Sequence, residues 1–135
     1  MLKRKQQSGE QASVLLVEPD VFLADIYEKN LLMEDFKVTK APSAERALAL
    51  LKTKKFDLAL LAAILPKMNG FELLEALKNS RETTPMPVLM LSKLGTKEDV
   101  DRSRSLGAAG YIIKTHFQPS EIVDKIKKIL FQRTR

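Results

Sequence analysis

The stretch DLALLAAILPKMNGFELL (residues 57–74) carries the signals that decide the fold. Its first part, Asp57–Ala62, is a short and mostly apolar run, which is typical of a strand buried on both faces of a sheet. The dipeptide Asn69-Gly70 then opens a segment that places Phe71 and Leu74 on one side of a helix. The stretch therefore predicts a buried strand, a short loop and an amphipathic helix.

The same unit repeats along the chain. The predicted strands are Val14–Val17, Lys37–Ala41, Asp57–Ala62, Pro87–Leu91 and Tyr111–Ile113. Helical patterns follow each strand, and their start and stop signals include Ser43, the pair Thr96 and Asp99, Gly107 and Pro119. In the first helix, from about residue 20 to 34, the residues at core-facing spacing are Leu23, Ile26, Tyr27 and Leu31. Five strand–helix units joined by short connections predict an α/β fold, in which a five-stranded parallel sheet carries helices on both faces.

Length and charge indicate one domain with two basic ends. The 135 residues suffice for a single core, and we expect the domain to span residues 14–131. The net charge of +6 divides into +2 for residues 1–13, +2 for residues 132–135, and +2 for the remainder, which has 18 basic and 16 acidic residues. We interpret the ends as a flexible basic N-terminal segment and a basic C-terminal tail. Their charge is the basis for one alternative function, a nucleic-acid-associated domain, although a nearly neutral core argues against nucleic-acid binding.

Composition excludes several classes of site. The chain has no cysteine and a single histidine, His116, so disulfides, thiolate metal sites and histidine-rich metal clusters are excluded. The longest apolar runs are far shorter than the ~20 residues of a membrane span, and no apolar stretch follows the basic N-terminal residues. We therefore expect a cytoplasmic protein that makes no membrane contact.

Ligands of open parallel sheets bind at the carboxyl ends of the strands. The residues that follow the predicted strands are therefore the candidates for a functional site: Glu18, Pro19 and Asp20, then Ala62 and Ala63, then Ser92 and Lys93, and finally Lys114 and Thr115.

Taken together, four segments resemble the receiver domain of bacterial two-component response regulators. They are VLLVEPD (14–20), the stretch 57–74, PVLMLSK (87–93) and GAAGYIIK (107–114), and the resemblance covers residues 14–131. It implies a flavodoxin-like (βα)5 architecture with strand order 2-1-3-4-5. It also implies phosphorelay chemistry, in which an aspartate takes a phosphoryl group from a histidine kinase while an acidic pair holds Mg²⁺.

Matched residue by residue, the resemblance implies these roles: Glu18 and Pro19 at the acidic pair, with Asp20 beside them; Ala62 at the phosphoacceptor; Ser92 and Lys114 at the hydroxyl and lysine positions; and Tyr111 as the switch aromatic. Three positions depart from the family: Pro19 replaces an aspartate, Lys93 a small residue, and Thr115 a proline. The last change predicts a trans Lys114–Thr115 peptide.

The departures remove the expected chemistry. Ala62 has no nucleophilic atom, and Glu18 with Lys114 sums to zero charge where the family pattern sums to −2. We therefore expect no enzymatic activity, no cofactor, and no metal binding unless the acidic pocket were restored with aspartates for Mg²⁺. Ala62 can be an introduced replacement in a phosphorylatable receiver or a natural loss, and the independent change at Pro19 favours the natural loss.

Simpler interpretations stand beside these roles. Asp20 suits a helix N-cap, Asp57 a surface role and His116 a loop. Ser92 and Lys114 can bond to each other, to Glu18 or to water, and Tyr111 can be plain packing.

The function we expect is phosphorylation-independent protein–protein interaction. The resemblance implies a partner such as a histidine kinase, another receiver or an output domain. It places the partner face, which would also serve a homodimer, on the fourth helix, fifth strand and fifth helix. The charged residues expected there, around Tyr111, are Asp99, Asp101, Arg102, Arg104 and Lys125.

Overall fold

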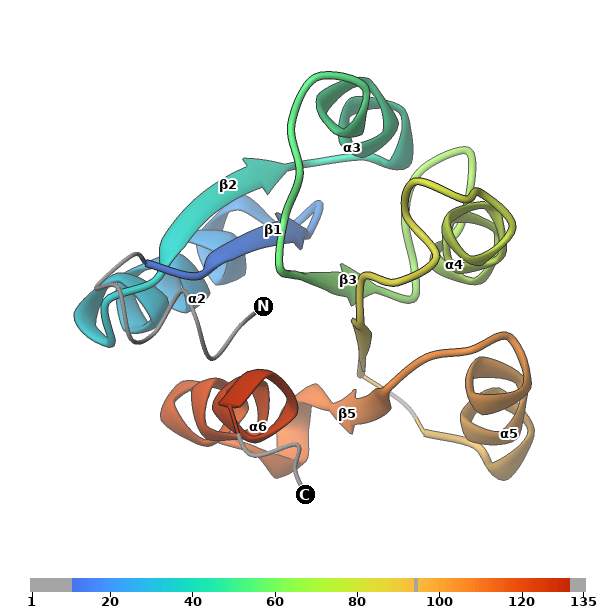
Figure 1. Cartoon of the computed structure of the whole chain (residues 1–135). Coiled ribbons are helices and arrows are strands. Elements are labelled where there is room, and N and C mark those ends of the chain that lie inside the picture. Colours follow the sequence, from blue (N-terminus) through green and yellow to red (C-terminus); the bar gives the residue numbers. More distant parts are fainter. Residues whose placement is uncertain (1–10, 94, 132–135) are drawn as a thin grey trace.

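The computed structural model describes residues 11–93 and 95–131. Five strands pair in parallel in the order β2-β1-β3-β4-β5 (Figure 1). The strands are β1 (Ser13–Val17), β2 (Lys37–Ala41), β3 (Leu58–Ala62), β4 (Val88–Ser92) and β5 (Gly110–Ile113). This arrangement confirms the predicted fold class and strand order.

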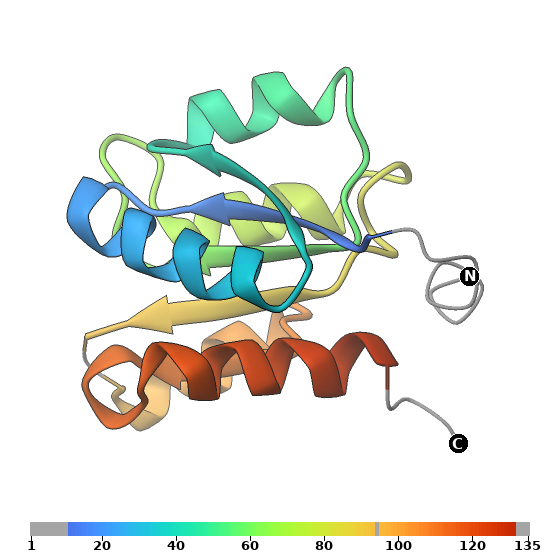
Figure 2. The same ribbon diagram turned by 90° about the vertical axis from the view of Figure 1, so that its left-hand side faces the viewer.

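Helices cover both faces of the sheet. They are α2 (Val21–Met33), α3 (Ala44–Leu51), α4 (Gly70–Lys78), α5 (Lys97–Ser105) and α6 (Pro119–Phe131), with a short 3-10 helix η1 (Lys114–His116) after β5. Helices α2 and α6 lie on one face, and α3, α4 and α5 lie on the other (Figures 1 and 2). No helix in the described ranges is long and apolar enough to cross a membrane.

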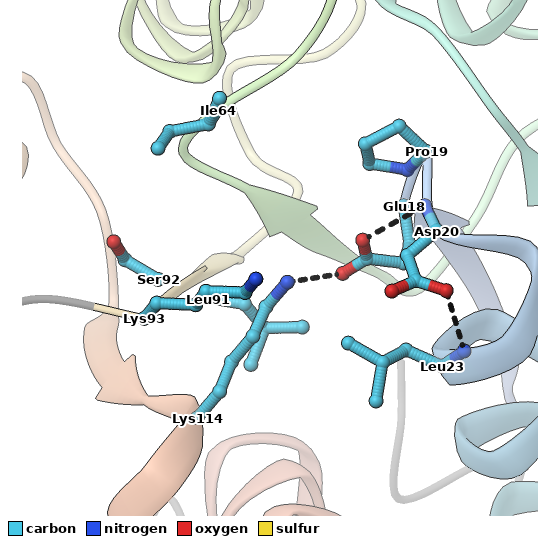
Figure 3. A pocket seen from close by; sticks show the side chains of 9 residues that line it. All are labelled: Glu18, Pro19, Asp20, Leu23, Ile64, Leu91, Ser92, Lys93 and Lys114. Carbon is cyan, nitrogen blue, oxygen red and sulfur yellow. Dashed lines mark hydrogen bonds and ion pairs between the residues drawn. The ribbon is translucent and has the colours of Figure 1, made fainter.

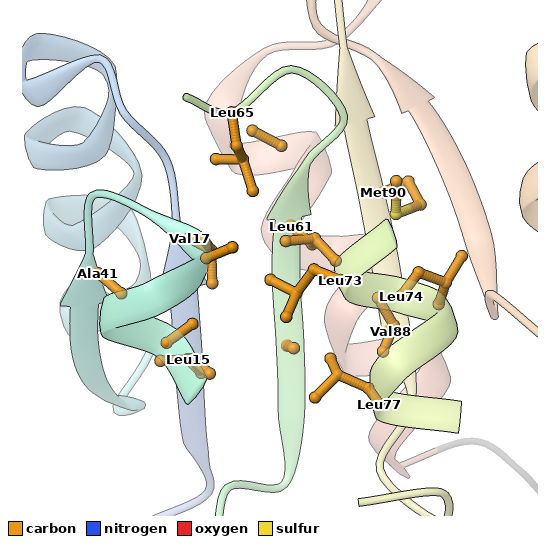
Figure 4. Packing of buried hydrophobic residues seen from close by; sticks show 14 of the residues in the cluster. Leu15, Val17, Ala41, Leu61, Leu65, Leu73, Leu74, Leu77, Val88 and Met90 are labelled. Carbon is orange, nitrogen blue, oxygen red and sulfur yellow. The ribbon is translucent and has the colours of Figure 1, made fainter. Parts of the chain in front are cut away.

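The core consists of two apolar layers, one on each side of the three central strands. All residues of β3 and β4 are buried, whereas the edge strands β2 and β5 are only partly buried. Burial on both faces explains why the central strands are continuously apolar. Figure 4 shows the layer under α3 and α4, where Leu73, Leu74 and Leu77 pack against Leu61 and Val88.

Local signals set the ends of the elements as predicted. Asp20, Ser43 and Thr96 accept hydrogen bonds from the first turns of α2, α3 and α5. Gly107 follows α5 with a φ of 102°, a left-handed conformation that favours glycine. The Lys114–Thr115 peptide is trans, as are the other described peptide bonds.

The first strand begins at Ser13, inside the segment predicted to be flexible. The carboxylate of Asp57 accepts a hydrogen bond from the Ser13 backbone N–H at 2.8 Å, which ties the starts of β1 and β3 together. Asp57 thus has a structural role at the end of the sheet opposite the candidate site. Residues 1–10 and 132–135, which carry the basic charges assigned to the two ends, lie outside the described residues.

One core prediction was wrong. Ile26 of α2, expected to face the core, is 36% exposed, while Ala24, Tyr27 and Leu31 supply the buried side of the helix. Because α2 is apolar on most of its circumference, periodicity alone does not identify its inner face.

Candidate functional site

The carboxyl ends of β1, β4 and β5 surround a pocket of about 200 Å³ (Figure 3). Its lining residues are Glu18, Pro19, Asp20, Leu23, Ile64, Leu91, Ser92, Lys93 and Lys114. The structure thus brings together Glu18, Ser92 and Lys114, three of the residues selected by their places after the strands. The pocket lies where ligands of open parallel sheets bind.

A buried ion pair forms the floor of this pocket. Lys114 Nζ lies 2.7 Å from Glu18 Oε1, and the two side chains are 13% and 2% exposed. The other carboxylate oxygen of Glu18 accepts a hydrogen bond from the Asp20 backbone N–H at 3.1 Å (Figure 3). Both oxygens of Glu18 are therefore engaged, as a buried carboxylate requires.

Asp20 is the N-cap of α2. Its Oδ1 accepts hydrogen bonds from the backbone N–H groups of Phe22 and Leu23, at 3.0 and 3.2 Å. The capping interpretation of Asp20 is confirmed. Pro19, between the two acidic residues, also lines the pocket, and its side chain has no carboxylate.

Ala62 is not among the residues that line the pocket. Its side chain is 2% exposed and belongs to the apolar layer under α3 and α4. The backbone of this region is fixed on both sides, because Ala63 N–H donates to Leu91 O at 2.7 Å and Gly70 N–H donates to Ala63 O at 2.9 Å. The end of β3 is therefore a rigid position.

Lysine and apolar side chains complete the pocket. Ser92 is buried at the end of β4, whereas Lys93 is exposed and extends into the pocket from the same strand end (Figure 3). The apolar residues Leu23, Ile64 and Leu91 were not selected from the sequence. Leu23 follows the cap of α2 by three residues, and this spacing is the signal that would have placed it beside the strand ends.

The resemblance implies a Mg²⁺ site here, but the donor set does not fit the ion. Mg²⁺ is commonly held by carboxylate oxygens and waters in octahedral geometry. Glu18 is occupied by Lys114 and a backbone N–H, and the Asp20 oxygen that faces α2 already accepts two N–H groups. No group of three His, Cys, Asp or Glu side chains in the described ranges is arranged to hold a metal ion.

Tyr27 lies behind the acidic residues, on the inner face of α2. It is 5% exposed. Burial, then repulsion from Glu18 and Asp20, raises the pKa of the Tyr27 phenol above its ordinary value. The carboxylates at the head of α2 thus affect the protonation of a core residue.

The residues predicted for the partner face lie on β5, α5 and α6. Tyr111 is half-buried and packs against the apolar layer beneath α3 and α4. On α5, Asp101 pairs with Lys97 at 2.9 Å and with Arg104 at 3.5 Å. Asp99 is partly exposed in the first turn of this helix.

Arg102 and Lys125, also predicted for this face, each lie against an aromatic ring. The Arg102 guanidinium lies 4.5 Å from the centre of the Phe71 ring on α4, and the Lys125 ammonium lies 5.0 Å from that of Phe117, in the segment before α6. Arg102 therefore extends toward α4. His116, which was predicted to lie in a loop, is exposed at the end of the short 3-10 helix η1.

Curated proteins of related sequence share this domain. The chain is 39% identical over 117 residues to the transcriptional regulatory protein CpxR of Klebsiella pneumoniae, covering 87% of this chain and 48% of that protein. It is 32% identical over 120 residues to the probable transcriptional regulator ycf29 of Porphyra purpurea, covering 89% of this chain and 57% of that protein. The chain thus spans about half the length of the curated relatives it matches.

Solved structures agree with the sequence relatives. The receiver domain protein of Methanospirillum hungatei is 31% identical, with a TM-score of 0.83 over 90% of this chain and 94% of that chain. Chemotaxis protein CheY4 of Vibrio cholerae is 25% identical, with a TM-score of 0.83 over 89% of this chain and 99% of that chain. The family described as "Response regulator receiver domain" matches residues 14–127. The chain therefore belongs to the response regulator receiver domain family of two-component signalling.

Proposed function

We propose that this chain is a receiver-like module without phosphoryl chemistry, which acts by binding a partner protein independently of phosphorylation. The observation that carries the proposal is Ala62, at the position that the family motif assigns to the phosphoaccepting aspartate. Acyl-phosphate formation needs a carboxylate oxygen that bonds to phosphorus as the donor's own bond to phosphorus breaks, which is P–N in a phosphohistidine and P–O in acetyl phosphate. The methyl group of alanine has no lone pair to offer.

The electrostatics of the pocket support the same proposal. Lys114 already neutralises Glu18 in a buried pair, and Pro19 contributes no second carboxylate. Lys93 adds a further positive charge at the mouth. A phosphoryl-transfer site needs a divalent cation to offset the charge of the incoming group, and this pocket lacks the ligands for one. We propose that the chain is not an enzyme.

The proposed partner is a protein of the same signalling class: a histidine kinase, another receiver or an output domain. The proposed docking surface is the face around Tyr111, with Asp99, Asp101, Arg102 and Arg104 on α5 and Lys125 on α6. Both signs of charge occur there, which favours a defined orientation of the partner over high affinity.

Acetyl phosphate tests the proposal directly. We expect the purified chain, incubated with acetyl phosphate and Mg²⁺, to show no phosphoryl adduct by intact mass, and its melting temperature to be unaffected by Mg²⁺. A receiver that retains the complete acidic set is the positive control for the donor. A phosphoryl adduct on any carboxylate of the pocket would contradict the proposal.

A second function has one observation in its favour. Ser92 and Lys114 both lie at the pocket, where a working receiver would use them on the phosphoryl oxygens. This placement fits a phosphorylatable receiver in which Ala62 replaces the native aspartate. Restoring the aspartate separates the two proposals, as argued at the end of the Discussion.

A further inference from the structure

The exposed apolar surface of the described chain is concentrated on one helix. Five of the six large hydrophobic side chains that are at least 36% exposed lie on the 13-residue helix α2. They are Val21 (70%), Phe22 (78%), Ile26 (36%), Leu32 (54%) and Met33 (71%). We estimate that they present roughly 500 Å² of surface, comparable to the largest apolar patch of a typical monomer, about 300–600 Å². Single exposed leucines are ordinary, but such a cluster indicates a binding surface.

The fold itself does not use this side of the helix. The inner face of α2 (Ala24, Tyr27 and Leu31) packs in the apolar layer shared with α6. Figure 2 shows α2 at the front of the molecule, above α6 and in front of the sheet. On the other side of the helix the apolar side chains are exposed, and Lys40 of β2 reaches Asp25 there.

The outer face has a definite pattern. With 3.6 residues per turn, Phe22, Ile26 and Met33 form one apolar row, and Val21 and Leu32 form a second row about 100° away. Between the rows lie Asp25 and Lys29, one turn apart near the middle of the helix. The face is therefore apolar at both ends and carries one charge of each sign at its centre.

We propose that a second copy of this chain packs its α2 antiparallel against this face, about a two-fold axis level with residue 27. This arrangement places Phe22 opposite the partner's Met33, and Val21 opposite the partner's Leu32. It also places Asp25 opposite the partner's Lys29. The midpoint of each pair lies within one residue of position 27, which is about 1.5 Å along the helix.

Self-complementarity of this kind is what a two-fold interface requires, because each contact occurs twice. The charges favour a second copy over an unrelated apolar helix, since an uncharged surface would offer no carboxylate to Lys29, whereas a second copy offers its Asp25. Asp25 also contacts Lys40 at 2.7 Å, but Lys40 has a second partner in Glu28 at 2.9 Å. Two such patches bury roughly 1,000 Å², the lower limit of a specific interface, so the dimer is weak and concentration-dependent.

Charge reversal gives a test that does not depend on any other partner. Asp25→Lys leaves two positive charges at the centre of the face, and Lys29→Asp leaves two negative charges. We expect each variant to weaken dimerisation at least tenfold in sedimentation equilibrium on the full chain, with an unchanged circular dichroism spectrum. An equimolar mixture of the two variants should dimerise again, because each positive centre then faces a negative one.

The matched control is Arg46→Asp, a charge reversal on the exposed surface of α3, which packs in the apolar layer on the other side of the sheet. It should leave dimerisation unchanged. A wild-type chain that stays monomeric to millimolar concentration would overturn the inference. A dimer that is lost with Arg104→Asp, on the face around Tyr111, but retained with Lys29→Asp would also overturn it. So would a failure of the two α2 variants to recover association when they are mixed. None of these results would bear on the proposed loss of phosphoryl chemistry, which is tested by mass.

Discussion

Tyr27 is a core residue whose pKa depends on the carboxylates of the candidate site. Burial, and then the charges of Glu18 and Asp20, raise the pKa of this phenol in the folded chain. The raised pKa means that the folded state favours the neutral phenol, whereas an unfolded tyrosine ionises near pH 10. The stability contributed by Tyr27 is therefore complete below about pH 10 and is lost as the pH rises from there through the folded-state pKa.

We expect Tyr27→Phe to flatten the decline in unfolding free energy above about pH 10, because phenylalanine has no proton to lose. Urea unfolding of the wild type and the variant across this range measures the difference. The matched control is Tyr111→Phe, which leaves Tyr27 beside its carboxylate neighbours, so the decline should persist. If the unfolding free energy of Tyr27→Phe falls as steeply with pH as that of the wild type, ionisation of the Tyr27 phenol does not contribute to the decline.

Residues that act locally could be predicted, and a residue with a distant partner could not. Asp20, Ser43 and Thr96 are confirmed as caps because a cap is defined by the next three residues. The partner of Lys114 remained open among Ser92, Glu18 and water, since Glu18 lies 96 positions away. The engagement of Arg102 with Phe71 likewise depends on how two helices pack.

Helices α2 and α5 show where element-scale patterns fail. Helix α2 has apolar residues on most of its circumference, so Ile26 could be placed on its inner side from the sequence although it lies outside. Helix α5 is mostly polar instead, and its one fully buried residue is Ser103. The Ser103 hydroxyl donates a hydrogen bond to Val100 O at 2.8 Å. Neither helix has the clear apolar stripe on which periodicity depends.

The contact between α4 and the end of β3 tolerates no side chain at Gly70. A Cβ added there would lie 2.2 Å from the backbone oxygen of Ala62 and 2.7 Å from the Cα of Ala63. Both atoms belong to a hydrogen-bonded strand end, so α4 would have to move. We expect Gly70→Ala to lower the free energy of unfolding by about 1–3 kcal/mol, although alanine is the better helix former.

Urea unfolding measures the effect of Gly70→Ala. The matched control is Lys97→Ala, at the equivalent first position of α5, where the side chain is exposed and forms only a surface pair. This control should change stability by less than about 0.5 kcal/mol. A neutral or stabilising Gly70→Ala would mean that α4 can shift away from β3 at little cost.

At the scale of the whole molecule, the alternation of apolar strands and helices predicted the sheet, and the family resemblance supplied its strand order. The positions after the strands also predicted where the pocket lies. The sequence did not predict that Ala62 would be buried and would not line the pocket, because the depth of a strand end depends on the loops and helices around it. The places of Ile64 and Leu91 in the pocket wall could not be predicted for the same reason.

The last prediction concerns restoring the family chemistry to this scaffold. Ala62→Asp alone should give at most weak Mg²⁺ binding, since the new carboxylate joins Glu18, which Lys114 already holds at 2.7 Å. Pro19→Asp alone should give no phosphorylation, because it supplies a metal ligand without a nucleophile. The double variant should recover Mg²⁺-dependent labelling by acetyl phosphate, because metal and nucleophile act as one unit and their effects are not additive.

Intact mass measures the labelling, and Mg²⁺ titration of the melting temperature measures the metal binding. The matched control is Pro19→Asp with Ala62→Asn, which has nearly the shape of the double variant but no carboxylate at position 62. A further Lys93→Ala should speed labelling if the exposed lysine crowds the pocket. Rapid Mg²⁺-dependent labelling of Ala62→Asp alone would show that Pro19 costs the site little. That result would favour the phosphorylatable receiver in which Ala62 replaces a native aspartate.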